Sequence, residues 1–257
     1  MRNVGLVILL LASLAAPTLA QDAPPPADAD EGQQQPPAEQ PAPQQPQPRA
    51  APAGEGLEGV AWFPLQANRR WTYRVTFSIE STAGEAQEPE QNSHTLDVYV
   101  TEPQTIDGRQ VAAMEWKLDG ELAQRSFFVT RDDVLYCVKR IQGFGEHMKE
   151  FALVEPQPNA REDLAVGQEW VWQGKAGPTP GRQTFKVVRE EEVATPAGTF
   201  KAMVLQVGFE GEDESRGTTT RWLVRGLGVV REVSEVRTAT SVFRTEGALS
   251  RFEGGAQ

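Results

Sequence analysis

The sequence predicts an all-β protein: an antiparallel, strongly curved sheet or open barrel of about ten strands, with very little helix. Many segments alternate apolar and polar residues, which is the period of a half-buried strand. Turn signals such as Asp-Gly separate these segments at short spacing. Because no long segment has the apolar stripe of a helix, the sheet must cover its apolar face by curling on itself.

The N-terminus has the layout of a secretory signal peptide over residues 1–20. A charged start at Arg2 precedes an apolar run at 4–16, and cleavage is expected after Ala20. The run is shorter than the roughly 20 residues that span a bilayer, so we expect no stable membrane insertion after cleavage. A lipoprotein signal needs a cysteine after the apolar run, whereas the single cysteine is Cys137. We therefore predict an exported protein, periplasmic or extracellular, that is not a lipoprotein.

The composition of residues 21–56 predicts a disordered Pro/Gln/Ala-rich linker. This stretch holds ten Pro, eight Gln and eight Ala, without one aromatic or branched aliphatic side chain. It cannot bury enough apolar surface to offset the entropy of ordering. We interpret it as a spacer, with a Pro-rich ligand for a partner domain as the alternative.

Both the linker and the folded part of the chain are acidic. The whole chain carries -11, the linker -5 and Arg2 +1, which leaves -7 for the β-rich domain that we place at 57–257. An acidic domain argues against nucleic acid and anionic membranes as partners.

Each expected strand is bounded by a turn signal. The clearest is 71–79, where Trp71, Tyr73, Val75, Phe77 and Ile79 alternate with polar residues. The best helical candidates are short pieces near 145–153 and 159–165. The remaining strands are expected at 94–101, 109–118, 121–130, 133–141, 182–193, 199–209, 217–224, 227–236 and 238–246.

An internal echo suggests two related five-strand halves, at 63–141 and 162–236. Features with the same spacing recur in the same order about 90 to 99 residues apart. Chance similarity between β sequences is the alternative. The matched features are Leu65 to Tyr73 with Leu164 to Trp172, Thr105 to Gly108 with Thr195 to Gly198, and Phe128 to Leu135 with Leu223 to Val230.

Several short motifs resemble a known family. Phe63-Pro64-Leu65, the pair Trp71 and Tyr73, and the stretches at 195–202 and 221–231 resemble the TapB-like exported bacterial domains of unknown function. The resemblance covers about residues 60–236. It implies a β-rich envelope domain and no assigned activity. This chain departs from the family at Asn68, where similar domains usually carry Gly.

The sequence offers no recognisable catalytic or metal centre, and we predict no catalytic residues, no bound metal and no cofactor. Its two histidines, His94 and His147, lie outside any zinc-binding spacing. The acidic stretch at 210–214 fits no standard calcium loop and is interpreted as a solvated loop. Cys137 lies in an apolar strand without a nearby histidine, so we expect a small buried residue.

The aromatic residues are the remaining candidates for a site. Most belong to the core, but in an incompletely closed barrel some would line the interior and meet an apolar ligand. We predict a non-enzymatic envelope domain that binds a lipid or another apolar or amphipathic ligand, or serves as a scaffold for an envelope protein. The alternative is a hydrolase that acts on an envelope polymer through paired carboxylates. The candidate ligand-binding residues are Trp71, Tyr73, Trp116, Trp170 and Trp172.

Overall fold

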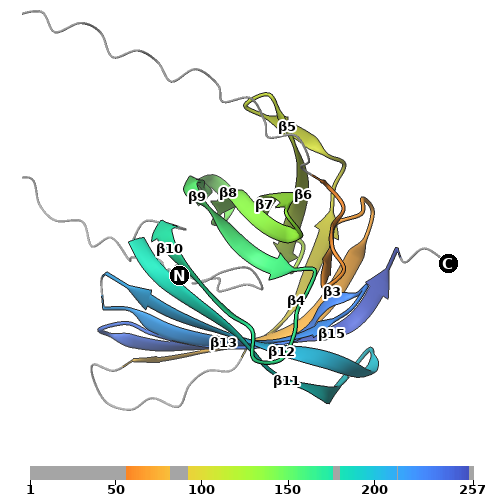
Figure 1. The fold of residues 1–257 in the computed structure, drawn as a ribbon. Helices are drawn as coiled ribbons and strands as arrows, with labels where there is room; N and C mark the ends of the chain where they lie inside the picture. Colours follow the sequence, from red (N-terminus) through yellow and green to blue (C-terminus); the bar gives the residue numbers. More distant parts are fainter. Residues whose placement is uncertain (1–55, 82–91, 176–179, 213, 255–257) are drawn as a thin grey trace, which may run out of the picture.

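The computed structural model describes residues 56–81, 92–175, 180–212 and 214–254. Within these residues the chain forms one large antiparallel sheet that curls until its two ends meet (Figure 1). The predicted signal peptide and almost all of the predicted linker lie outside the described residues. The all-β fold class is confirmed, although the sheet has more strands than the ten expected.

The strands follow one another in space nearly as they do in sequence. Twelve lie on one hydrogen-bonded path, in the order β10-β11-β12-β13-β14-β15-β3-β4-β6-β7-β8-β9, with β5 paired to β6 alone. The bounds are β1 (Gly59–Val60), β2 (Phe63–Pro64), β3 (Arg70–Ser81), β4 (Asn92–Val100), β5 (Gln104–Ile106), β6 (Arg109–Leu118), β7 (Glu121–Arg131), β8 (Val134–Gln142), β9 (Lys149–Arg161), β10 (Glu169–Lys175), β11 (Pro180–Thr195), β12 (Gly198–Gly211), β13 (Arg216–Val224), β14 (Gly228–Arg237) and β15 (Ser241–Glu253).

Two junctions between strands decide the shape. β3, the first long strand, pairs with β15, the last one, and so joins the two halves of the chain. At the opposite side β9 and β10 end the path and contact each other without pairing. The barrel is therefore almost closed.

The predicted strands form for the expected reason. In β3 the aromatic and aliphatic residues from Trp71 to Phe77 are buried and alternate with more exposed polar residues. Ile79 shares their face but is 40% exposed, because it lies at the end of the strand.

The Asp-Gly and Asp-Asp turns are two-residue hairpins. Asp119 and Gly120 have φ of 49° and 87°, and Asp132 and Asp133 have 51° and 59°. Such turns need positive φ at both central residues, which Asp and Gly tolerate. Asn68, where the resembling family usually carries Gly, also has a positive φ of 68°.

The helical candidates at 145–153 and 159–165 are wrong. Within the described residues a single 3-10 turn forms, at Gly145–His147, and residues 149–161 are strand β9. Strand β10 is absent from the ten segments expected from alternation, although the match of Leu164 to Trp172 with Leu65 to Tyr73 implies a strand there. Both segments lie at the ends of the sheet, where one flank is open, so they lack the clean alternation of an interior strand.

The buried residues include a set of polar and charged side chains besides the apolar core. Arg140 on β8 donates to Gln157 on β9 at 3.0 Å, and Gln157 donates to Gln183 on β11 at 2.7 Å. Arg221 and Glu232 form a buried ion pair at 2.7 Å. Buried polar groups of this kind are tolerated because they are hydrogen-bonded, and they fix which strands face one another.

The proposed duplication stays a prediction. The two sets of five strands, β3-β4-β6-β7-β8 and β10-β11-β12-β13-β14, are each contiguous in the sheet, with β9 and β15 as additional strands. Strand-by-strand superposition of the two sets is the test.

Candidate functional site

The five candidate aromatic residues divide into two groups. Trp71, Tyr73 and Trp116 line one cavity between β3, β4 and β6. Trp170 and Trp172 lie on β10, at the junction with β9, and are not among the residues that line this cavity. Trp172 is nevertheless buried in the same main core as Trp71, Tyr73 and Trp116, and Trp170 packs against that core, so the two groups are two regions of one interior.

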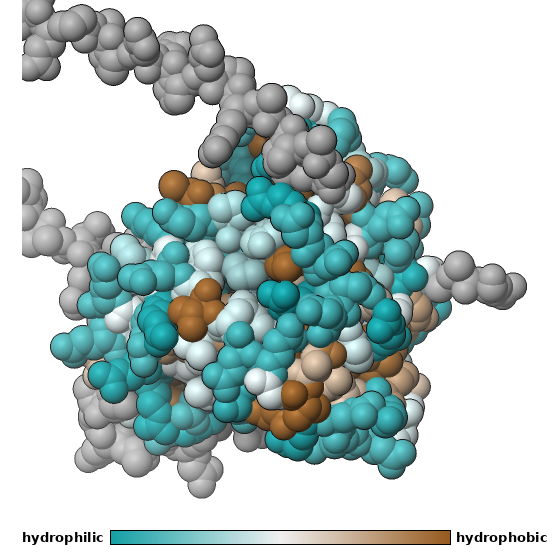
Figure 2. Space-filling model, viewed as in Figure 1, coloured by the Kyte–Doolittle hydropathy of each residue, from teal (hydrophilic) through white to brown (hydrophobic). Residues whose placement is uncertain are grey.

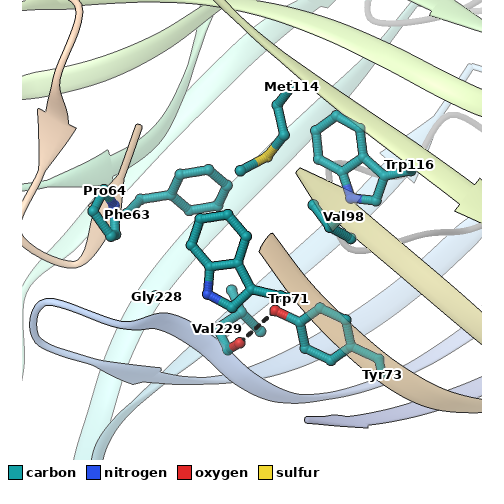
Figure 3. A pocket seen from close by; sticks show the side chains of 9 residues that line it. All are labelled: Phe63, Pro64, Trp71, Tyr73, Val98, Met114, Trp116, Gly228 and Val229. Carbon is teal, nitrogen blue, oxygen red and sulfur yellow. Dashed lines mark hydrogen bonds between the residues drawn. The ribbon is translucent and has the colours of Figure 1, made fainter. Parts of the chain in front are cut away.

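The cavity is apolar and almost filled. The space open to the centre of a water molecule is about 20 Å³, room for about one water. Figure 3 shows the side chains that surround it. The buried indole nitrogen of Trp116 has no hydrogen-bond partner among the described residues. The cavity is lined by Phe63, Pro64, Trp71, Tyr73, Val98, Met114, Trp116, Gly228 and Val229.

A short N-terminal segment closes the barrel end above this cavity. We call residues 57–65, which contain β1 and β2, the plug. Val60, Phe63 and Leu65 of the plug are buried in the main core. Gly59 is required in this hairpin, because it has a φ of 78° and an added Cβ would lie 2.2 Å from the carbonyl oxygen of Phe63.

The first residues of β3 fasten the turn before β14 to the same barrel end. The indole N–H of Trp71 donates to the carbonyl of Leu227 at 2.7 Å, and the hydroxyl of Tyr73 donates to the carbonyl of Val229 at 2.7 Å. Burial raises the pKa of Tyr73 far above its ordinary value, and the nearby Glu232 carboxylate adds to the shift. Tyr73 is therefore a neutral structural donor.

Glu162 fastens the plug from the other side. Its carboxylate accepts from the backbone N–H of Ala61 at 2.6 Å and from Arg225 at 2.7 Å. Its carbonyl accepts from the indole N–H of Trp62 at 3.1 Å. We call the bonds made by Trp71, Tyr73 and Glu162 the latch. The motif residues Phe63, Trp71, Tyr73 and those at 225–229 thus meet at one barrel end, where they have a structural role.

The second region is the seam, defined as β9, β10 and the connection at 162–168. Trp170 stacks on Phe185 of β11, with ring centroids 5.0 Å apart. The indole N–H of Trp172 crosses the seam and donates to the carbonyl of Glu155 at 3.2 Å. Gly174 leaves the space for this arrangement, since an added Cβ would lie 2.6 Å from the Trp172 ring.

Strand β9 is irregular where it faces β10. Its pairing with β8 jumps from Ala152 to Gln157 while β8 advances from Lys139 to Cys137, which leaves a bulge at 153–156. Pro156 and Pro158 also lack the N–H that a strand edge offers. Bulges and prolines are the usual protection of an edge strand, and here they prevent β9 from pairing with β10.

An acidic hollow lies at the β11 and β12 end of the seam. Its volume open to water is about 370 Å³. Three carboxylates line it against one guanidinium, and Arg182 and Glu210 are 4.0 Å apart. The hollow is defined by Glu155, Gln173, Gly174, Pro180, Gly181, Arg182, Glu210, Gly211 and Glu212.

The carboxylates that are buried do not form the pair that a glycoside hydrolase needs. Among the described residues they are Glu115, paired with Arg125, and Glu232, paired with Arg221. Since Glu115 alternates with Met114 and Trp116 of the cavity, it faces the outside of the sheet. A hydrolase would have to use exposed carboxylates.

Metal binding and cysteine chemistry find little support. No group of three His, Cys, Asp or Glu side chains is placed to hold a metal ion within the described ranges. Cys137 is completely buried in β8, as the sequence predicts, and burial raises the pKa of its thiol. Nor does the described part of the chain contain a helix of the length and apolarity needed to cross a membrane.

Glu155 and Glu162, whose contacts hold the seam and the plug, are not among the predicted site residues. The contacts of Glu162 join residues that are 63 to 101 positions apart in the sequence. The bond between Trp172 and Glu155 joins residues 17 positions apart. An isolated glutamate has no sequence pattern of its own. The prolines at 156 and 158 were the available signal for a strand edge.

No family model and no curated protein matches the chain. A Bacteroides fragilis structure described as "a putative exported protein with YmcC-like fold" is 14% identical, covers 76% of this chain and 100% of that one, and has a TM-score of 0.43. A "putative lipoprotein" from Parabacteroides distasonis is 14% identical over 76% of this chain and 99% of that one, with a TM-score of 0.40. The hypothetical lipoprotein YmcC from Escherichia coli is 11% identical over 71% and 87%, with a TM-score of 0.29. At these TM-scores the likenesses decide neither fold nor function, and the resemblance to TapB-like domains stays a prediction.

Proposed function

We propose that this chain is an exported, non-enzymatic scaffold domain that acts through its outer surface and not by carrying an apolar ligand inside its barrel. The observation that carries the proposal is the filled interior at the predicted aromatic site. A pocket for a drug-sized ligand measures about 300–1,000 Å³. The cavity between Trp71, Tyr73 and Trp116 measures about 20 Å³.

The hydrogen bonds of the latch also support the scaffold proposal. The groups of Trp71 and Tyr73 that could orient a ligand already donate to backbone carbonyls of the same chain. A lipid in this cavity would have to displace lining side chains such as Phe63 of the plug, which is 8% exposed and is buried in the main core together with Leu65. Burying such side chains is worth about 1.5–3 kcal/mol each, so the plug is a stable part of the fold.

The test is native mass spectrometry of the protein purified from the cells that produce it. We expect the mass of the unliganded mature chain, and no quenching of tryptophan fluorescence by a lysophospholipid carrying a bromine-labelled acyl chain. A stoichiometric lipid adduct, or quenching that Trp116→Phe reduces, would overturn the scaffold proposal in favour of a carrier.

A second experiment tests whether a partner protein binds to the outer surface of the barrel. Photo-crosslinking residues placed at exposed positions around the barrel, one at a time, are expected to give a protein adduct from one face and none from the others. Uniform labelling from every face would contradict a specific scaffold.

A further inference from the structure

Strand β10 has a free edge. It pairs with β11 alone, without a register shift from Glu169 to Lys175. Because Val187 N–H donates to the carbonyl of Gln168, the alternation of the ladder turns the backbone groups of 169, 171, 173 and 175 away from β11. Within the described ranges no backbone hydrogen bond joins β10 to β9.

The seam also gathers the exposed aliphatic side chains. Of the four large apolar residues that are exposed in the described chain, three lie here: Val154 is 84% exposed, Val166 57% and Val171 51%. Figure 2 shows a mainly hydrophilic surface on the side it views, with hydrophobic residues in separate small groups. A partner at the seam therefore needs backbone and charge contacts besides apolar ones.

The negative charge near the seam favours a positively charged partner. The acidic hollow presents Glu155, Glu210 and Glu212 against Arg182. A cationic side chain that enters it meets the carboxylates of Glu210 and Glu212, neither of which belongs to β9. The domain as a whole carries -7, so attraction of a basic partner extends beyond the hollow.

We propose that an extended, basic segment of a partner protein binds at the seam by adding as a strand to the free edge of β10, with a lysine or arginine in the acidic hollow. This inference rests on the proposed scaffold function and names its partner class. Strand addition gives affinity through main-chain hydrogen bonds, and alternate side chains give specificity. The added strand displaces the bulge of β9, which includes Glu155 and which, among the described residues, bonds to β10 through the indole of Trp172. Glu210 and Glu212 then remain in the hollow to meet the lysine or arginine.

Two other occupants fit less well by charge and chemistry. The chain's own segment at 21–56 carries -5 and ten prolines, which cannot donate to a ladder. A second copy of the domain brings another -7 to an acidic surface. Binding of a second copy is an outcome that the experiment distinguishes by dimerisation.

The test uses the full mature chain and a fluorescently labelled seven-residue peptide of alternating lysine and valine. We expect saturable binding by fluorescence anisotropy, weakened at least tenfold when the ionic strength rises from about 0.05 to about 0.5 M. A glutamate–valine peptide and a lysine–valine peptide with methylated backbone nitrogens are expected not to bind. Equal binding of the methylated peptide would overturn strand addition.

Matched variants locate the site. The double variant Glu210→Lys, Glu212→Lys is expected to weaken binding at least tenfold, while Glu58→Lys, an exposed glutamate at the plug end, is expected to leave it within twofold. Equal effects of the two would overturn the location. Since all three side chains are exposed, circular dichroism is expected to show the same fold.

The outcomes separate the two proposals. Failure of the peptide to bind, or dimerisation in analytical ultracentrifugation that Val171→Lys abolishes, would overturn the basic partner at the seam and leave the scaffold proposal standing. A lipid adduct in native mass spectrometry would overturn the scaffold proposal itself.

Discussion

The plug end and the seam are the two places where the barrel could be opened, and they are held in different ways. At the plug end, buried aromatic side chains, backbone carbonyls and the Glu162 carboxylate meet in a closed network. At the seam, one indole bond crosses from β10 to β9, and three valines face solvent. Trp71 of β3 and the two tryptophans of β10 therefore differ in role: Trp71 holds the plug end closed, whereas Trp170 and Trp172 pack on the core beside an edge that stays available.

The largest expected effect tests the latch. Trp71→Ala removes a side chain that is 3% exposed and leaves the carbonyl of Leu227 without its donor. We expect the free energy of unfolding to fall by about 3–5 kcal/mol in urea denaturation. Trp172→Ala is expected to cost less, because the open seam can relax into the space. An equal loss of unfolding free energy in Trp172→Ala would show that the seam is packed as tightly as the plug end, which would contradict the difference between the two regions.

Tyr73→Phe tests the latch with a smaller change. Loss of the hydroxyl leaves the buried Val229 carbonyl unpaired and is expected to cost about 1–3 kcal/mol at neutral pH. The folded pKa of Tyr73 lies above the unfolded value of about 10. Its contribution is therefore complete below that pH and is lost as the pH rises. The variant should lose less stability than the parent between about pH 9 and about pH 11. Parallel losses in the two proteins would show that Tyr73 is not buried as described.

Glu162→Gln tests how the plug is held. Glutamine keeps an acceptor for Ala61 but loses the ion pair with Arg225, whose side chain is 64% exposed, so we expect a loss of about 1 kcal/mol. Hydrogen exchange of the Ala61 amide should accelerate more than that of amides in β12. Unchanged exchange at Ala61 would mean that burial of Phe63 and Leu65 alone fixes the plug.

The smallest effect on global stability is expected at the seam. Trp172→Phe preserves most of the packing and removes the N–H that reaches Glu155. Unfolding free energy should change by about 1 kcal/mol or less. Exchange of β9 amides should accelerate, and the lysine–valine peptide should bind more tightly, because displacing the bulge costs less. Weaker peptide binding would indicate that the indole itself contacts the guest strand.

Much of the fold could be predicted from local pattern. The ten expected strands all form, since each carries its own alternation and its own turn. The end strands could not be found in this way. β9 is shaped by a bulge and two prolines, and its irregular residues read as short helical pieces when taken without their neighbours.

Which aromatic residues share a cavity could not be predicted from the sheet face alone. Trp116 and Trp172 both lie in the main core, but Trp71, Tyr73 and Trp116 line one cavity whereas Trp170 and Trp172 lie apart from it on β10. Their separation depends on where β9 and β10 meet, and that contact involves residues with no distinguishing sequence pattern.

The sequence by itself determined that the domain is built of antiparallel strands, where most of them begin and end, and that its surface is acidic, because these properties depend on neighbouring residues and on composition. Tertiary structure alone decided that the aromatic interior is filled, that the plug is latched and that β10 keeps a free edge. Each of these depends on contacts between residues distant in sequence, in which side-chain volumes and unpaired backbone groups are matched only after the sheet has curled.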